Sequence, residues 1–338
     1  MRPFAPIRPK ALLVITLNTA LKTRRADTLM ILIVLVWGLN YIVMKDGLSD
    51  IDPLTFNALR FMLGAPVIGL VALRDRSILR LPRRYWREVG LATLLSALAY
   101  QILFLEGLDR TTSTNSALLS ATMPTWTGAI SILVGLVEIR RRLLAGIAIT
   151  LLGVALVVFR RAGADFSLSG DDLIGSLLVL ASAVLLGGGN LVRKTAIDHV
   201  GSLRMAVWSY WITAAGLTIV AAPNLLTLSA ADVPLRSLPN VLYSGWIASV
   251  GGFMIVSYAL GEIGPTRTAT YFNFNPIVAS CAGILILGEP FSIWLLVGGA
   301  MTLGGVMLVR QNVYARRRPS APHAVAETAP EPAPAAGK

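Results

Sequence analysis

The chain contains ten apolar segments of about 17 to 25 residues, separated by short joints that hold glycine, proline or charged residues. An α-helix rises about 1.5 Å per residue, so a segment of this length crosses the roughly 30 Å hydrocarbon layer of a bilayer. The spacing therefore predicts an all-helical integral membrane protein with ten transmembrane helices. The predicted helices cover approximately residues 28–45, 54–73, 88–107, 114–137, 143–159, 172–192, 203–222, 240–260, 267–288 and 291–309.

The composition excludes an ordinary soluble domain. Of the 338 residues, 55% are hydrophobic and only 14% are charged, whereas soluble domains have about 25% charged residues. The net charge of +12 does not indicate a nucleic-acid partner, because the basic residues lie between apolar segments and no basic stretch carries aromatic residues at a sheet-like spacing. The expected partners are the lipid bilayer and a small-molecule substrate, and the oligomeric state stays open.

The second half of the chain repeats part of the first. A shift of about 152 positions aligns Thr114–Val157 with Thr266–Val309 without a gap. Five predicted crossings separate the two copies, and an odd number of crossings turns the second copy upside down. We therefore predict two inverted five-helix repeats, at residues 28–160 and 172–310. The identical pairs include Pro124/Pro276, Gly146/Gly298, Thr150/Thr302 and Gly153/Gly305.

A shorter and weaker match relates the first predicted helix to the sixth. It pairs Gly38 with Gly188, Asn40 with Asn190, and Lys45 with Lys194. Inverted repeats are the architecture of many secondary transporters, in which a site near the midplane opens to alternate sides of the membrane. The repeat thus favours transport.

The distribution of basic residues predicts the orientation. Lys and Arg number 24 in the joints on one side of the membrane and five in the joints on the other. Because cytoplasmic joints are enriched in these residues, both termini are expected in the cytoplasm. Residues 1–27 are expected to form a cytoplasmic extension. Residues 316–338, rich in Pro and Ala, are expected to be disordered because they have too little apolar bulk to fold.

Several motifs extend over residues 28–310. They are Trp37-Gly-Leu-Asn40-Tyr41 with Lys45, Pro53 and Arg60, Asn115-Ser-Ala-Leu-Leu with Pro124, and Pro276 with Leu287-Gly-Glu-Pro290 and the glycine-rich Gly298–Gly305. Together they resemble the EamA-type members of the drug/metabolite transporter superfamily. The resemblance implies a ten-helix carrier of the inner membrane, often an exporter of amino acids or other small metabolites. The run Tyr271-Phe-Asn-Phe-Asn275 departs from the more aliphatic pattern of the family, so no specific substrate is implied.

Polar side chains inside the predicted spans are the candidate substrate-binding groups, because they cost free energy unless they meet a partner or a wet cavity. Pro276 also frees the carbonyl of Phe272, four residues earlier. Hydrogen bonding between helices is the alternative role for such side chains, and residues 273 and 275 cannot share one face of a regular helix. The candidates are Asn40, Tyr100, Gln101, Asn115, Trp126, Asn190, Tyr271, Asn273 and Asn275.

Charged and metal-binding groups are sparse in the predicted spans. We favour anchoring or packing for Lys45 and Arg60, near the outer ends of their helices, although Lys45 would attract a carboxylate or phosphate if it reached a cavity. No acidic residue occupies a helix centre. With one cysteine, Cys281, and the distant His199 and His323, no catalytic residues, metal site or cofactor are expected.

The sequence therefore predicts a secondary transporter that moves a small metabolite, an amino acid or a similar polar or amphipathic solute, by alternating access, with export favoured. One alternative is a nucleotide-sugar or phosphate-ester antiporter, which would need several cationic cavity residues where only Lys45 is expected. Another is a membrane-embedded protein that does not transport, including an enzyme acting on lipid. Substrate identity, direction and coupling ion are not determined by the sequence.

Overall fold

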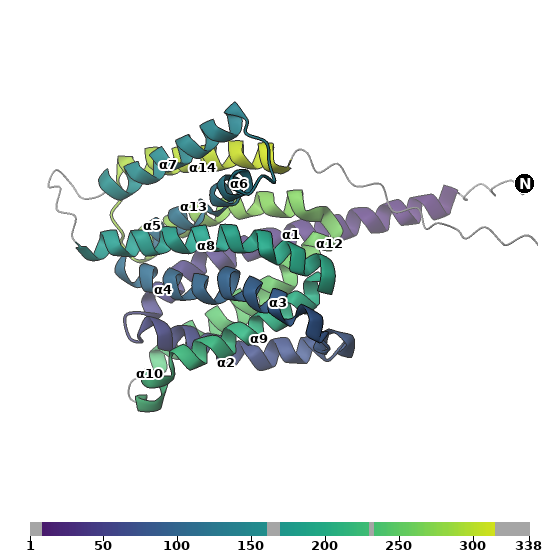
Figure 1. Cartoon of the computed structure of the whole chain (residues 1–338), viewed down its shortest axis with the longest axis horizontal. Helices are drawn as coiled ribbons and strands as arrows, with labels where there is room; N and C mark the ends of the chain where they lie inside the picture. The colour runs from purple at the N-terminus through teal and green to yellow at the C-terminus, as the bar shows by residue number, and fades with distance from the viewer. Residues whose placement is uncertain (1–8, 161–169, 230–232, 315–338) are drawn as a thin grey trace, which may run out of the picture.

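The computed structural model describes residues 9–160, 170–229 and 233–314, and this part of the chain is helical without any β-strand (Figure 1). The long helices lie side by side in one bundle, and the first and last of them both reach the same end of it. The longer helices are α1 (Pro9–Gly47), α2 (Pro53–Ala72), α3 (Trp86–Thr93), α4 (Tyr100–Arg110), α5 (Ser113–Ser120), α6 (Met123–Leu133), α7 (Arg141–Arg160), α8 (Gly170–Val200), α9 (Ser202–Val220), α12 (Gly252–Tyr271), α13 (Asn275–Ile286) and α14 (Ile293–Tyr314).

Shorter helical pieces complete the bundle. Two of them are π-helical segments inside longer helices. One is η3 (Leu94–Ala99), between α3 and α4, and the other is η5 (Tyr243–Gly251), between α11 (Leu238–Leu242) and α12. Both fall at similar places in the two predicted repeats, the third and the eighth predicted helix. The shorter pieces are η1 (Arg76–Leu79), η2 (Arg83–Tyr85), η3 (Leu94–Ala99), α10 (Ala222–Thr227), η4 (Leu235–Ser237), α11 (Leu238–Leu242), η5 (Tyr243–Gly251) and η6 (Phe272–Phe274).

Eight helices in the described part of the chain are long and apolar enough to cross a membrane. They correspond to all the predicted spans except the fourth and the ninth. The membrane-spanning candidates are Leu21–Gly47, Pro53–Ala72, Arg83–Arg110, Arg141–Val158, Gly170–Val200, Ser202–Val220, Leu235–Val256 and Ile293–Arg310.

The fourth and ninth predicted spans are interrupted rather than continuous. The fourth is divided into α5 and α6 just before Pro124, and the ninth narrows to the 3₁₀ turn η6 just before Pro276. A proline has no N–H to donate to the carbonyl four residues earlier, so each proline removes one helical hydrogen bond at its break. The matched prolines therefore end one helical piece and begin another at equivalent positions.

Three predicted boundaries are wrong. Helix α1 begins at Pro9 rather than near residue 28, because residues 10–37 contain no helix-breaking proline or glycine. Helix α8 extends to Val200, beyond residue 192. The joint expected at residues 261–266 has helical backbone within α12. The tail 316–338 and residues 1–8 lie outside the described residues.

Helices α7 and α14 pack against each other through matched glycines. A Cβ at Gly153 would lie 2.6 Å from the carbonyl oxygen of Gly298, and one at Gly305 would lie 2.7 Å from that of Gly146. Only glycine permits this approach of the two backbones. Contacts between 146 and 305 and between 153 and 298 mean that the helices run antiparallel.

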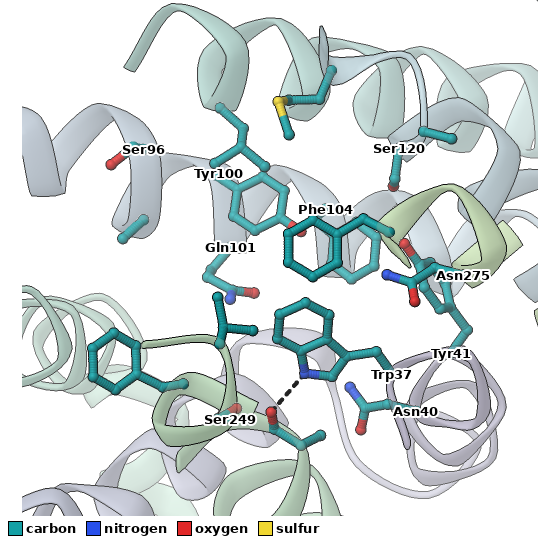
Figure 2. A pocket seen from close by; sticks show the side chains of 18 of the residues that line it. Trp37, Asn40, Tyr41, Ser96, Tyr100, Gln101, Phe104, Ser120, Ser249 and Asn275 are labelled. Carbon is teal, nitrogen blue, oxygen red and sulfur yellow. Dashed lines mark hydrogen bonds between the residues drawn. The ribbon is translucent and has the colours of Figure 1, made fainter. Parts of the chain in front are cut away.

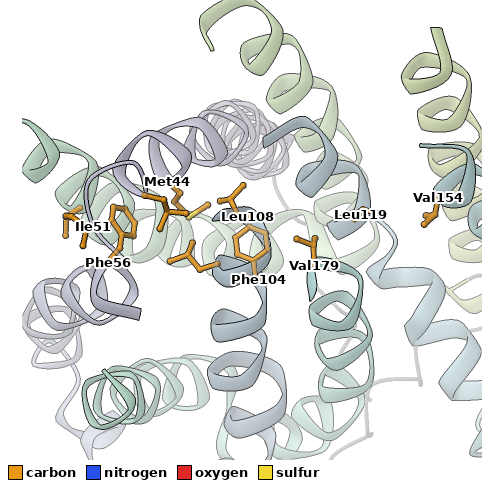
Figure 3. Packing of buried hydrophobic residues seen from close by; sticks show 11 residues of the cluster. Met44, Ile51, Phe56, Phe104, Leu108, Leu119, Val154 and Val179 are labelled. Carbon is orange, nitrogen blue, oxygen red and sulfur yellow. The ribbon is translucent and has the colours of Figure 1, made fainter. Parts of the chain in front are cut away.

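One of the buried apolar cores lies at one end of the bundle. It contains Met44, Leu48 and Ile51 around the α1–α2 connection, together with Phe56, Phe104 and Leu108 (Figure 3). We call this end, which also holds the α4–α5 connection at residues 111–112, the capped end. The opposite end, where the described parts of α1 begin and α14 end, is the terminal end (Figure 1).

Candidate substrate cavity

A cavity of about 470 Å³ lies inside the bundle, lined by residues of every longer helix except α3 and α7. Its volume is in the range of small-molecule binding sites. Both interrupted helices contribute, through residues next to Pro124 and Pro276. The aromatic lining residues are Trp37, Tyr41, Phe61, Tyr100, Phe104, Tyr210, Phe253 and Phe272.

The aromatic side chains near the centre of the cavity are held in defined orientations (Figure 2). The ring of Phe104 stacks on Tyr100 at 5.6 Å between centroids and meets Tyr41 edge-on at 5.7 Å. Trp37 donates from Nε1 to the carbonyl oxygen of Ala248 at 2.7 Å. That carbonyl belongs to the π-helical η5, where the usual four-residue hydrogen-bond pattern is interrupted. The rings therefore present a fixed apolar surface to the cavity.

Arg60 is a cation on the lining and is only 3% exposed. Its Nε and Nη2 donate to Asn57 Oδ1 at 3.0 and 2.8 Å, one turn earlier on α2. Nη2 also donates to Gln101 Oε1 at 2.7 Å, and Nη1 donates to Ser244 Oγ at 2.9 Å and Met44 Sδ at 3.1 Å. All of these partners are neutral.

Five of the predicted site residues line the cavity: Asn40, Tyr100, Gln101, Asn273 and Asn275. Asn273 and Asn275 both reach it because the 3₁₀ turn η6 ends between them and α13 begins at Asn275, so the regular-helix spacing does not apply. Asn273 Oδ1 accepts from Arg310 at 2.6 Å. The Oδ1 atoms of Asn40 and Asn275 are buried and have no hydrogen-bond partner among the described residues.

Four other predicted candidates lie outside the lining and bond to neighbouring groups. Asn115 donates to Thr111 and Ser176 at 3.0 and 2.7 Å. Trp126 donates to Thr122 Oγ1 at 3.1 Å, on its own helical turn. The remaining two bonds run from Asn190 Nδ2 to Met123 Sδ at 3.5 Å and from Tyr271 OH to Asp27 Oδ1 at 2.8 Å. Contact of these four with substrate stays a prediction.

Lys45, the cation considered for anion attraction, also lies outside the cavity lining. Its Nζ donates to the backbone carbonyls of Leu108 and Asp109 at 2.9 and 2.5 Å. The side chain thus joins α1 to the end of α4 at the capped end, in agreement with an anchoring role.

The structure corrects the expectation that Lys45 is the one cation available to the site. Arg60, Arg193 and Arg310 all line the cavity, and no Asp or Glu does so among the described residues. Sequence reasoning assigned Arg60 to anchoring and counted Arg193 and Arg310 only as orientation charges. The i, i+3 pairing of Asn57 with Arg60 in an apolar helix was the available signal for Arg60.

No group of three or more His, Cys, Asp or Glu side chains comes together within the described ranges. The chemistry that the cavity offers is therefore that of guanidinium groups, amides, hydroxyls and aromatic rings.

Comparison with known proteins places the chain among transporters. A probable amino-acid metabolite efflux pump of Salmonella typhimurium is 28% identical over 87% of this chain and 97% of its own. A probable terminal-alkyne amino-acid exporter of Streptantibioticus cattleyicolor is 25% identical over 88% of this chain and 97% of its own. An uncharacterised transporter of Bacillus subtilis is 24% identical over 85% of this chain and 96% of its own.

A solved crystal structure with 19% identity shares the fold, with a TM-score of 0.57 over 84% of this chain and 96% of that chain. The EamA-like transporter family matches residues 24–159 and again residues 173–311. Together with the apolar helices, these matches describe a multi-pass membrane protein. Because the two matches cover most of the sequence, the chain belongs to the EamA-like transporter family.

Proposed function

We propose that this protein is a secondary transporter that exports a small amino-acid-like metabolite across the inner membrane by alternating access. The observation that carries the proposal is the cavity, which is lined by both interrupted helices and adjoins a buried apolar core at the capped end. Interrupted helices near a central site are characteristic of secondary transporters, because freed backbone groups can serve the solute. The relatives named as an amino-acid metabolite efflux pump and an amino-acid exporter suggest the class of solute.

We also propose that the fold consists of ten crossings arranged as two inverted repeats. The contact between residues 146 and 305 becomes the contact between 298 and 153 when the two copies are exchanged. Contacts of this form arise between antiparallel helices related by a two-fold axis perpendicular to them. Glycines also pack α1 on α13 and α8 on α6, where Gly38 meets Val278 and its counterpart Gly188 meets Ile130. The two family matches and the two π-helical segments support the same arrangement.

The proposed orientation places both termini in the cytoplasm. Arg193 and Arg310, which line the cavity, belong to the basic residues that mark the cytoplasmic side in the sequence. Helices α8 and α14 both end at the terminal end shortly after these arginines. The cavity thus extends toward the cytoplasmic side, as expected for a state that takes up solute for export.

A phosphate-ester antiporter is the second candidate, and the three lining arginines favour it more than the sequence did. A phosphate ester carries more negative charge than a carboxylate and is suited to arginine. The aromatic lining favours the amino-acid-like solute instead, because a sugar phosphate offers little apolar surface to pack on the rings. The proposed role is that of a carrier rather than an enzyme, in line with the transporter names of the family and relatives.

Efflux from intact cells tests the proposed function. Cells that overproduce the protein are expected to resist toxic amino-acid analogues and to retain less of a preloaded radiolabelled solute than cells with the empty vector. Asn275→Ala should reduce efflux at least about threefold, since a loss of roughly 0.7 kcal/mol of binding has that effect. Asn224→Ala is the matched control and should retain efflux, because Asn224 is exposed, lies outside the cavity lining and donates to Asp52 Oδ1 at 2.9 Å.

The membrane abundance of each variant is measured by immunoblot. If overproduction changes neither resistance nor retention for any solute of a broad metabolite panel, the proposed function is wrong. If Asn224→Ala is impaired and Asn275→Ala is not, the cavity is not the transport site.

A further inference from the structure

We infer that the cavity selects an organic anion, a carboxylate with an apolar or aromatic body, and that Arg60 binds its carboxylate. This inference rests on the proposed transport function and names the substrate class of the same site. It differs from the expectation of an ordinary zwitterionic amino acid, because the preferred solute lacks a free ammonium group. N-acylated amino acids and 2-hydroxy acids have this chemistry.

The first support is the way Arg60 is held. Asn57, Gln101 and Ser244 come from three separate helical segments and orient the planar guanidinium. A guanidinium fixed in this manner loses little freedom when it binds a carboxylate. On the remaining side, Nη1 donates to the Met44 sulfur at 3.1 Å. A thioether is a weak acceptor. A carboxylate oxygen in its place would therefore accept a stronger hydrogen bond from Nη1.

The second support is the absence of a counter-charge. No ion pair involves Arg60 among the described residues, and the cavity lining in that part of the chain contains no carboxylate. A buried cation without a counter-ion is costly, and a bound anion relieves that cost. Arg193 adds positive charge to the same lining, so the field attracts anions and opposes cations.

The third support is a pair of unsatisfied acceptors. Asn40 Oδ1 and Asn275 Oδ1 are buried without a partner. Asn40 lies beside Arg60, because its Nδ2 donates at 3.4 Å to the same Met44 sulfur. A ligand with its carboxylate on Arg60 can therefore donate a neutral N–H or O–H to these amides, which an acylamino or hydroxyl group next to the carboxylate supplies.

The charge distribution decides between an anion and a zwitterion. An ammonium group moved from water into this cavity would find neutral acceptors only and would lie in a field of positive sign. The rings of Tyr100 and Phe104 favour an apolar body and disfavour a sugar phosphate. The geometry thus points to a carboxylate rather than a phosphate ester.

Three ligands with one apolar body test the inference: N-acetyl-L-phenylalanine, L-phenylalanine and L-phenylalaninamide, with charges of −1, 0 and +1. Binding to the purified full-length protein in nanodiscs is measured by isothermal titration calorimetry. We expect the anion to bind at least about tenfold more tightly than the zwitterion, and the cation to bind most weakly. Glucose 6-phosphate is included as the phosphate-ester probe and is expected to bind more weakly than the anion.

Variants of Arg60 separate charge recognition from folding. Arg60→Gln should weaken binding of the anion at least about tenfold and change binding of the cation little, whereas Arg60→Lys should keep the preference for the anion. Arg204→Gln is the matched control, because Arg204 donates to backbone carbonyls of Val200 and Ser77 away from the cavity lining; its binding should equal that of the parent. Thermal unfolding of each variant in nanodiscs checks that it is folded.

Equal affinities across the charge series, tightest binding of the zwitterion, or no binding of any member to folded protein would overturn the inference. So would an unchanged preference in folded Arg60→Gln, or tightest binding of glucose 6-phosphate. These results leave the cellular efflux experiment unaffected, because a transporter of some other solute would still lower retention in cells. Loss of efflux for every solute would instead refute the proposed function.

Discussion

The capped end and the terminal end of the bundle differ in how their connections are tied together. At the capped end, Lys45 joins α1 to carbonyls at the end of α4. Its counterpart in the shorter sequence match, Lys194 near the terminal end, pairs with Asp198 on its own helix. Similar sequence therefore takes part in a connection between helices at one end and in a local surface pair at the other.

Further hydrogen bonds join neighbouring elements at the capped end. Glu289 accepts from the backbone N–H groups of Ser113 and Thr114 at 2.8 and 3.1 Å and so caps the start of α5. Arg236 pairs with Asp50, and this contact, followed by the Ser237 hydroxyl, holds the pKa of the Asp50 carboxyl below its ordinary value. At the terminal end, Arg204 and Trp208 donate to the carbonyls of Ser77 and Ile78 and join α9 to η1. The ends therefore differ in the lysine contacts and in the carboxylate that caps α5, and a carrier that is closed on one side needs a difference of this kind.

The strongest way to break the comparison is to remove packing from the capped end. Phe56 is fully buried there, and Phe56→Ala should lower the free energy of unfolding by about 3 kcal/mol or more, because it leaves a cavity in the apolar core. Phe274→Ala is the matched control, since Phe274 is 52% exposed; its cost should stay within about 0.5 kcal/mol. Thermal and denaturant unfolding in one detergent measure both. Equal costs would contradict the asymmetry.

A smaller effect is expected from the cap on α5. Glu289→Gln removes a charge-assisted acceptor and should cost about 1 to 2 kcal/mol of stability. Glu138→Gln is the control, because the Glu138 side chain is 73% exposed and pairs with Arg140 at 3.5 Å. Its expected cost is below about 0.5 kcal/mol.

The reaction rate of a thiol buried at the capped end is a second measurement of the effect of Glu289→Gln. Leu48→Cys is introduced into a Cys281→Ser background, which removes the single native cysteine. Leu48 is 8% exposed, so its thiol should react slowly with a maleimide in the parent and several times faster with Glu289→Gln. An unchanged rate, with unchanged stability, would show that Glu289 does not hold this end closed.

The smallest effect compares the two lysines directly. Lys45→Met removes two hydrogen bonds to carbonyls and should cost about 1 kcal/mol. Lys194→Met removes an exposed pair within one helix and should cost no more than about 0.5 kcal/mol. Unfolding curves of the two variants sharpen the comparison between the ends. A larger cost for Lys194→Met would reverse the assignment of the closed end.

The interruptions at Pro124 and Pro276 show what the sequence predicts well. A missing N–H is a covalent property of proline, so its consequence for a helix does not depend on the rest of the fold. The glycines of α7 and α14 are similar, since their coincidence in the repeat already indicated a shared packing role. The apolar segments likewise predicted helices, because length and hydropathy are properties of the segment alone.

Arg60 shows what the sequence predicts poorly. The sequence places Arg60 in the second predicted helix. The apolar residues around it are equally compatible with anchoring at a helix end and with burial beside a cavity. The choice depends on Asn57, Gln101 and Ser244, and two of these lie 41 and 184 residues away in the chain. Residues two apart cannot share one face of a regular helix, but Asn273 and Asn275 both line the cavity because the 3₁₀ turn before α13 changes the directions of their side chains.

By itself, the sequence determined that the chain is helical, that it is membrane-embedded, and where its helices are interrupted, because these follow from local composition and covalent chemistry. Only the tertiary structure decided which polar side chains share a cavity, that the cations there are arginines without a lining carboxylate in the described part of the chain, and which groups join the connections at the capped end. Those features depend on contacts between helices distant in sequence. They also depend on the conformational state. Lys45 and Lys194 have similar sequence surroundings, yet one bonds to another helix and the other to its own helix.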